Sequence, residues 1–164
     1  MDAALLENKV KYDAWVKPLL VFPIVLLIGL GILFYIDACS RDIFPREPES
    51  ESLMAFYVMI VTAVIILAVY WFTLPHSIFV YRDKIKIVFG GFAWNIPFKN
   101  VVSVKAARGL VVWWGYNCIT SYGSQIEILR KNRMKIRISP ENRDQFLEYA
   151  NRALEDWRKI HASS

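Results

Sequence analysis

Two long runs without a charged residue constrain this chain more than any other feature of its sequence. They cover residues 18–36 and 53–74, which is 19 and 22 residues. At a rise of 1.5 Å per residue, helices of these lengths span roughly 28 and 33 Å, close to the about 30 Å of a bilayer's hydrocarbon core. A secretory signal peptide has a shorter apolar stretch, followed by a small-residue cleavage site. The runs therefore predict two transmembrane helices, over residues 18–38 and 53–75.

Aromatic pairs flank both runs and predict how they are arranged. They are Tyr12 and Trp15 before the first run, Phe34 and Tyr35 at its end, Phe56 and Tyr57 at the start of the second run, and Tyr70 and Trp71 near its end. An antiparallel hairpin brings these pairs to two common levels, as the aromatic belts at membrane interfaces require. We therefore expect a helical hairpin joined by an acidic loop over residues 39–52.

Charge is divided unevenly along the chain. Residues 1–75 carry a net charge of −3 and the remainder a net charge of +8. Basic residues of membrane proteins gather on the cytoplasmic side. The division predicts that both termini are cytoplasmic, as the segment 1–17 and the domain 76–164, with the loop 39–52 outside.

The sequence offers few groups for catalysis or for metal binding. Cys39 and Cys118 are predicted on opposite sides of the membrane and therefore do not pair within one chain. His76 and His161 have no partnered acid and nucleophile at motif spacing. The sequence contains no CxxC, P-loop, GxGxxG, HExxH or GxSxG pattern. We therefore expect no catalytic residues, no cofactor and no metal.

Residues 76–164 change to the period-two alternation of strands. Seven strands are expected, over residues 78–80, 85–89, 92–96, 101–107, 110–114, 125–130 and 134–138. A helix is expected over about residues 140–161, with Ser139 as its N-cap and Pro140 at its first position. Phe146, Ala150, Ala153, Trp157 and Ile160 form an apolar stripe along that helix.

The last two strands have a predictable register. A turn over residues 131–133 places Ile128 opposite Ile136 and Ile126 opposite Ile138. A slip of one residue turns every side chain to the other face, so the apolar match favours this longer turn over a two-residue turn.

Three phrases of the domain carry a family resemblance. They are residues 78–85 (IFVYRDKI), 95–104 (NIPFKNVVSV) and 136–142 (IRISPEN). With them the chain resembles bacterial pleckstrin-homology-like (bPH) domain membrane proteins with an N-terminal two-helix hairpin. The resemblance implies a seven-stranded β-sandwich or partly open barrel, capped by the C-terminal α-helix. It also implies a bacterial inner (plasma) membrane or an internal membrane derived from one, and it carries no catalytic residues. Phosphoinositide-binding pleckstrin domains of eukaryotes hold the lipid with basic residues around the first loop between strands. Here that loop is only Arg82-Asp83-Lys84, with an acid at its centre, so specific inositol-phosphate binding is not expected.

Two surfaces of the domain are candidates for function. The first is a continuous apolar run beside a tyrosine, made of Leu110, Val112, Trp113, Trp114 and Tyr116. It is either a strand buried on both faces or an exposed aromatic edge that contacts a partner or the membrane. The second is a basic hairpin, made of Arg130, Lys131, Arg133, Lys135 and Arg137. It is either an ordinary solvated hairpin or a contact for anionic lipid headgroups.

These features predict a non-enzymatic integral membrane protein. Its domain is expected to mediate protein–protein interaction, as an accessory subunit, scaffold or assembly factor bound to another membrane protein or to a second copy. The alternative is an anionic-lipid-binding or envelope-stress module that uses the basic hairpin. An enzyme with a site shared with a partner chain stays open as a third hypothesis. Nucleic acid is not expected, because no aromatic platform interleaves the charges.

Overall fold

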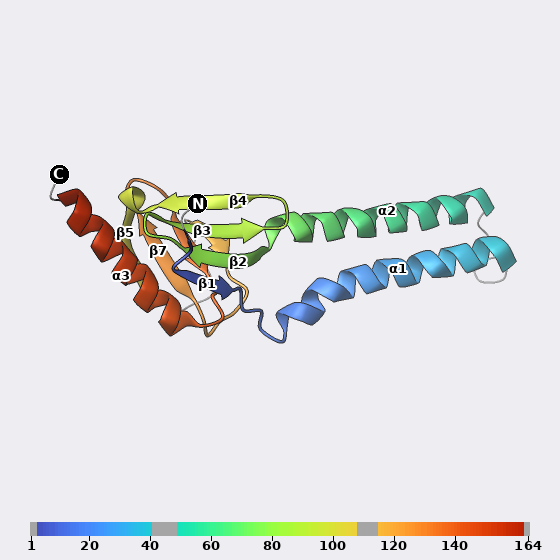
Figure 1. Cartoon of the computed structure of the whole chain (residues 1–164). Helices are drawn as coiled ribbons and strands as arrows, with labels where there is room; N and C mark the ends of the chain where they lie inside the picture. The colour runs from blue at the N-terminus through green and yellow to red at the C-terminus, as the bar shows by residue number, and fades with distance from the viewer. Residues whose placement is uncertain (1–2, 41–48, 108–114, 163–164) are drawn as a thin grey trace. The chain divides into compact units, whose positions relative to one another are not determined.

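The computed structural model describes residues 3–40, 49–107 and 115–162 (Figure 1). The chain divides into two compact units. One unit is a helical hairpin, Ala14–Trp71, and the other joins the described residues up to Asp13 with those from Phe72 onward.

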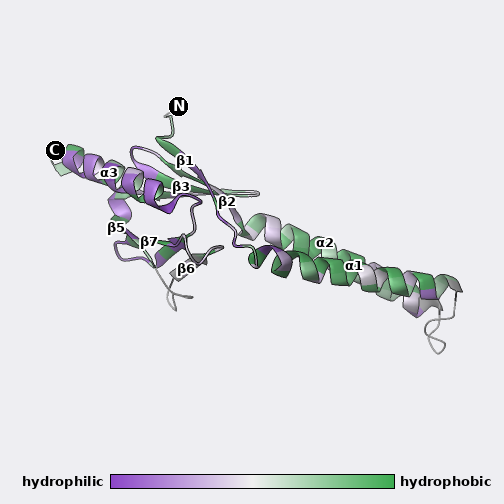
Figure 2. Ribbon diagram, turned by 90° about the horizontal axis from the view of Figure 1, so that it is seen from below, coloured by the Kyte–Doolittle hydropathy of each residue, from purple (hydrophilic) through white to green (hydrophobic). Residues whose placement is uncertain are grey.

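The hairpin consists of α1, Val16–Ser40, and α2, Glu49–Thr73. Most of its large apolar side chains are exposed, and both helices are predominantly green in Figure 2. Both are long and apolar enough to cross a membrane. The prediction of two long apolar helices is therefore confirmed.

The two helices pack against each other near the end of the hairpin where residues 41–48 connect them. The ring centroids of Tyr35 and Phe56 lie 5.3 Å apart, so the expected common level of these aromatic pairs is confirmed. A Cβ built on Gly31 comes within 3.4 Å of the Met59 side chain, so α2 approaches α1 closely there. The Ser52 hydroxyl donates a 2.7 Å hydrogen bond to buried Asp37, which satisfies one polar contact between the helices.

The first sheet of the other unit is antiparallel throughout and has the order β1-β2-β3-β4. Its strands are β1, Leu6–Lys9; β2, Pro75–Val80; β3, Lys84–Phe89; and β4, Ala93–Pro97. Strands β2 and β3 alternate between buried and partly exposed side chains over most of their length. The alternation in the sequence predicted β2 to β4 for this reason.

Strand β1 corrects the predicted domain boundary. The charge pattern predicts residues 1–17 as a segment separate from the domain, but β1 pairs antiparallel with β2, with Leu6 opposite Val80 and Lys9 opposite Ser77. The four residues of β1 include only one apolar side chain. Such a segment has no recognisable period, and it becomes a strand because β2 offers it a free edge.

The second sheet has the order β5-β7-β8-β6. After a short 3₁₀ turn, Phe98–Asn100, its strands are β5, Val101–Ala106; β6, Gly115–Cys118; β7, Ile126–Arg130; and β8, Lys135–Ile138. Strands β5, β7 and β8 pair antiparallel, whereas β6 pairs parallel with β8. Ile128 lies opposite Ile136 and Ile126 opposite Ile138, so the predicted register is confirmed.

The described residues therefore form two four-stranded sheets, whereas a β-sandwich or partly open barrel of seven strands is expected from the sequence. The difference arises at two places. Strand β1 adds an unpredicted strand to the first sheet. The predicted strand 110–114 lies outside the described residues, and β6 begins immediately after it, at Gly115.

Helix α3, Arg143–Ala162, closes the core between the sheets. It contacts β5 of the second sheet and β1 and β2 of the first, as Figure 1 shows. Phe146, Ala150 and Ala153 of the predicted apolar stripe are buried. The stripe ends earlier than expected, since Ile160 is 66% exposed.

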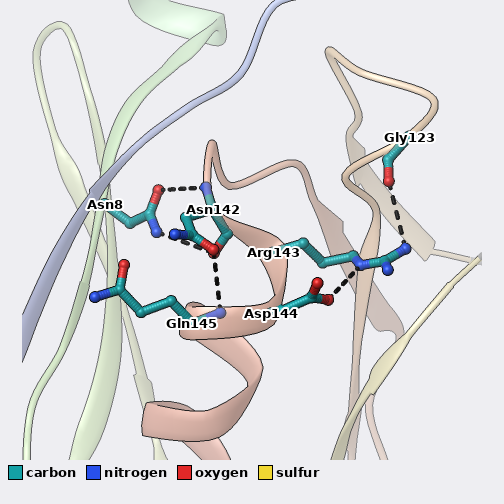
Figure 3. Close-up of polar contacts among 6 residues, drawn as sticks. All are labelled: Asn8, Gly123, Asn142, Arg143, Asp144 and Gln145. Atoms are coloured by element: carbon teal, nitrogen blue, oxygen red, sulfur yellow. Dashed lines mark hydrogen bonds and ion pairs between the residues drawn. The ribbon is translucent and has the colours of Figure 1, made fainter.

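The start of α3 also differs from the prediction. Ser139 is fully buried and is not the N-cap, because its hydroxyl accepts from the backbone N–H groups of Thr120 and Ser121. The cap is Asn142, whose Oδ1 accepts a 3.2 Å hydrogen bond from the N–H of Gln145 (Figure 3). Local sequence rules assign the Ser139 hydroxyl to the helix N-terminus, but in the structure it bonds to a segment distant in the sequence.

Candidate functional site

The predicted apolar run is described in the structure at one position. Leu110, Val112, Trp113 and Trp114 lie outside the described residues, and Tyr116 lies on β6. The Tyr116 side chain is 52% exposed. This exposure is consistent with the surface interpretation at Tyr116.

Tyr116 packs against Trp94, a residue that belongs to neither of the surfaces predicted from the sequence. Their ring centroids lie 4.9 Å apart and their planes meet at 80°, the edge-to-face geometry that aromatic pairs favour. Trp94 lies on β4 and Tyr116 on β6, the outer strands of the two sheets. The pair therefore joins the two sheets at their edges. Trp94 belongs to a predicted strand, but only the packing of the sheets shows that it meets Tyr116.

Arg130, at the end of β7, lies over this aromatic pair. Its guanidinium carbon is 5.2 Å from the centroid of Trp94 and 5.9 Å from that of Tyr116, which is cation–π distance. Its Nε donates a 2.8 Å hydrogen bond to the carbonyl oxygen of Met134. Arg130 is only 8% exposed, so most of its side chain is enclosed by the aromatic cluster.

Burial makes the electrostatics of Arg130 unusual. Desolvation lowers its pKa, and the nearby charge of Arg133 lowers it further, while Tyr116 acts in the opposite direction. Because arginine keeps its charge over the ordinary pH range, the shift reflects both the partial desolvation of this cation and its repulsion from Arg133.

These residues line an open depression of about 710 Å³. We call it the aromatic–arginine surface, and its lining residues are Phe92, Trp94, Tyr116, Arg130, Arg133 and Met134. Phe92 and Met134 are each more than half exposed. The surface thus combines residues from both predicted candidates with two that neither included.

Two of the other cations of the basic hairpin form ion pairs with the same acid, Glu127. The nitrogen–oxygen distance is 3.3 Å for Lys135 and 3.2 Å for Arg137. Arg137 lies opposite Glu127 in the register of β7 and β8, which explains this pair. Lys131 and Arg133 are exposed at the turn and form no ion pair within the described part of the chain.

A polar cluster at the start of α3 is satisfied by contacts within the domain. A second depression lies at the start of α3, where Asn8 accepts from the N–H group of Asn142 (Figure 3). Asn8 also accepts from the N–H group of Glu141. There Arg143 contacts both Asp144 and the carbonyl oxygen of Gly123. Within residues 3–40, 49–107 and 115–162, no group of three His, Cys, Asp or Glu side chains is placed to hold a metal ion. The arrangement of the aromatic–arginine surface offers cation and aromatic contacts to a ligand.

Comparisons of this chain with protein-family models, curated proteins and solved structures find no match. The resemblance to bPH-domain proteins therefore stays a prediction.

Proposed function

We propose that this chain is an integral membrane protein of a bacterial inner membrane or a derived internal membrane. Its cytoplasmic domain binds another membrane protein, as an accessory subunit, scaffold or assembly factor. The contact is made by the aromatic–arginine surface. The proposal assigns no catalytic step to the domain.

The membrane part of the proposal is supported by α1 and α2. Their exposed apolar side chains are costly in water and are stabilised by lipid. The net charge of +8 on residues 76–164 favours a cytoplasmic domain.

The interaction part is supported by one observation above all, the packing of Arg130 against Trp94 and Tyr116 beside exposed Phe92 and Met134. Tryptophan, tyrosine and arginine are the residues that most often dominate the energy of protein interfaces. Three large apolar side chains exposed in one depression are costly in water unless a partner covers them.

Site-specific crosslinking in living cells tests this function. A photoreactive phenylalanine analogue replaces Tyr116 in the full chain, and a matched variant carries it at Tyr149, a partly exposed tyrosine of α3. We expect one discrete crosslinked membrane protein from position 116 and none of that size from position 149. The absence of any adduct at position 116, with normal insertion of the protein, contradicts the proposal.

Cysteine labelling tests the topology. Cys39 is exposed near the end of α1, and Cys118 lies on β6. In intact spheroplasts, a membrane-impermeant maleimide is expected to label a variant that keeps only Cys39. Because Cys118 is partly buried, the cytoplasmic reporter is Lys99→Cys, an exposed position, in a chain without the two native cysteines, and it is expected to react after the membrane is opened. The opposite pattern contradicts the proposed orientation.

Anionic-lipid binding is the second candidate, supported by exposed Lys131 and Arg133 at the hairpin turn. It predicts salt-sensitive binding of short-chain phosphatidylglycerol to the full chain, lost when both residues become glutamine. Equal binding by the double variant argues against it.

A further inference from the structure

The cations of the basic hairpin are not equally neutralised. Glu127 pairs with Lys135 and Arg137. Arg130 and Arg133 have no carboxylate partner within the described residues, although both line the same depression. The aromatic–arginine surface therefore carries two positive charges that the chain's described residues do not balance.

We propose that the aromatic–arginine surface binds an acidic segment of the partner protein, with a carboxylate beside Arg133 and Arg130 and a neighbouring large apolar side chain in the depression. This inference rests on the proposed function and names the chemistry of its partner.

The carboxylate follows from the environment of Arg130. A buried charge is costly unless an opposite charge or hydrogen bonds compensate it. Here the compensation consists of one hydrogen bond to Met134 and two aromatic faces. The repulsion between Arg130 and Arg133 contributes to the lowered pKa of Arg130. A carboxylate bound near both side chains balances the charge of Arg130 and weakens this repulsion.

The apolar side chain follows from the walls of the depression. Phe92, Tyr116 and Met134 are 54%, 52% and 53% exposed. Phe92 is held in place by stacking on Phe89, with centroids 4.5 Å apart. Aromatic side chains fixed in this way lose little conformational entropy on binding. The surface is therefore preorganised for a segment that places an aromatic or aliphatic group next to an acid.

The number of cations that line the aromatic–arginine surface favours a protein segment over a lipid surface. Polybasic sites for anionic lipids contain clusters of about 4–8 Lys or Arg. The aromatic–arginine surface itself is lined by two cations, Arg130 and Arg133, and Arg130 is buried. Few cations beside a large apolar surface match an acidic peptide with an apolar residue.

A direct binding measurement tests the proposal. The full chain is reconstituted in phosphatidylcholine nanodiscs, and the probe is a fluorescein-labelled pentapeptide of four glutamates around one tryptophan. We expect saturable binding at low salt that Arg133→Glu weakens about tenfold or more. The matched control is Lys99→Glu, an exposed residue of the 3₁₀ turn, which changes the net charge equally and is expected to bind like the parent chain.

Two further arms separate the parts of the proposal. Replacing the tryptophan of the peptide by alanine is expected to weaken binding, and short-chain phosphatidylglycerol is expected not to compete. No binding at low salt, or equal losses for Arg133→Glu and Lys99→Glu, overturns the proposal. Competition by phosphatidylglycerol overturns it in favour of a lipid. Crosslinking from position 116 does not use this peptide. A crosslinked membrane protein without peptide binding therefore contradicts only the acidic segment, whereas the absence of a crosslink contradicts the proposed function itself.

Discussion

The hydroxyl of Tyr12 donates a 2.8 Å hydrogen bond to the carbonyl oxygen of Pro75. Tyr12 precedes α1 and Pro75 begins β2, directly after α2. The N–H of Val10 also bonds to the carbonyl oxygen of His76, at 3.3 Å. The apolar hairpin is therefore an insertion between two hydrogen-bonded strands of one domain, β1 and β2.

This arrangement predicts that the domain folds without its hairpin, provided that β1 is kept. We expect a variant in which a short Gly/Ser linker replaces residues 14–73 to unfold cooperatively on heating. The fragment 76–164 lacks β1 and is expected to unfold at a lower temperature or without a cooperative transition. Circular dichroism on heating measures both. Equal stability of the two chains contradicts a structural role for β1.

Asn8 is the main polar contact between β1 and the start of α3. Its side chain donates to the carbonyl oxygen of Asn142 and accepts from the N–H groups of Glu141 and Asn142. We expect Asn8→Ala to lower the free energy of unfolding by about 1–2 kcal/mol, because it removes three partly buried hydrogen bonds to the backbone of Glu141 and Asn142. The control Asn8→Asp keeps both acceptor contacts and is expected to cost less. Urea denaturation of the linker-joined domain measures the difference.

Gln125 is fully buried, and both side-chain polar atoms lack a hydrogen-bond partner within the described residues. Burying an unpaired amide costs about 1–3 kcal/mol. We therefore expect Gln125→Met, which has a similar shape, to raise the free energy of unfolding by about 1 kcal/mol. The control is Gln145→Met, at an exposed position of α3, which is expected to change little. A clear loss of stability for Gln125→Met contradicts the prediction.

Stability is expected to fall at alkaline pH. Burial raises the pKa of the Cys118 thiol, and burial followed by the charge of Cys118 raises that of Tyr12. Because the folded state favours the neutral forms, their contribution is complete below the ordinary thiol pKa of about 8.5. It is lost as pH rises through the higher pKa values of the folded state.

Thermal unfolding of the linker-joined domain across this pH range measures the alkaline loss. Cys118→Ala and Tyr12→Phe each remove one titrating group and are expected to flatten the alkaline part of the curve. The Tyr12 variant also loses the hydrogen bond to Pro75, so its stability is expected to be lower at neutral pH as well. An unchanged alkaline slope in both variants contradicts this explanation.

Local patterns in the sequence were sufficient where neighbouring residues decide the structure. The uncharged runs predicted α1 and α2, since an apolar segment of bilayer length satisfies its backbone hydrogen bonds within itself when it forms a helix. The alternation of residues 126–138 predicted the register of β7 and β8, because only one pairing places Ile126 and Ile128 opposite apolar partners.

Sequence patterns failed where a distant segment changed the role of a residue. Ser139 reads as a helix cap, but contacts with Thr120 and Ser121 use its hydroxyl instead. Arg130 reads as one of several surface cations, but the edges of the two sheets enclose it between Trp94 and Tyr116.

The sequence by itself determined the two apolar helices, the strands β2 to β4 and the hairpin of β7 and β8. Short-range periodicity and the cost of exposing apolar surface fix these elements. Only the tertiary structure decided that β1 completes the first sheet and that Trp94, Tyr116 and Arg130 form one surface. These contacts join residues far apart in the chain, and their energy arises from packing and desolvation, which no local pattern encodes.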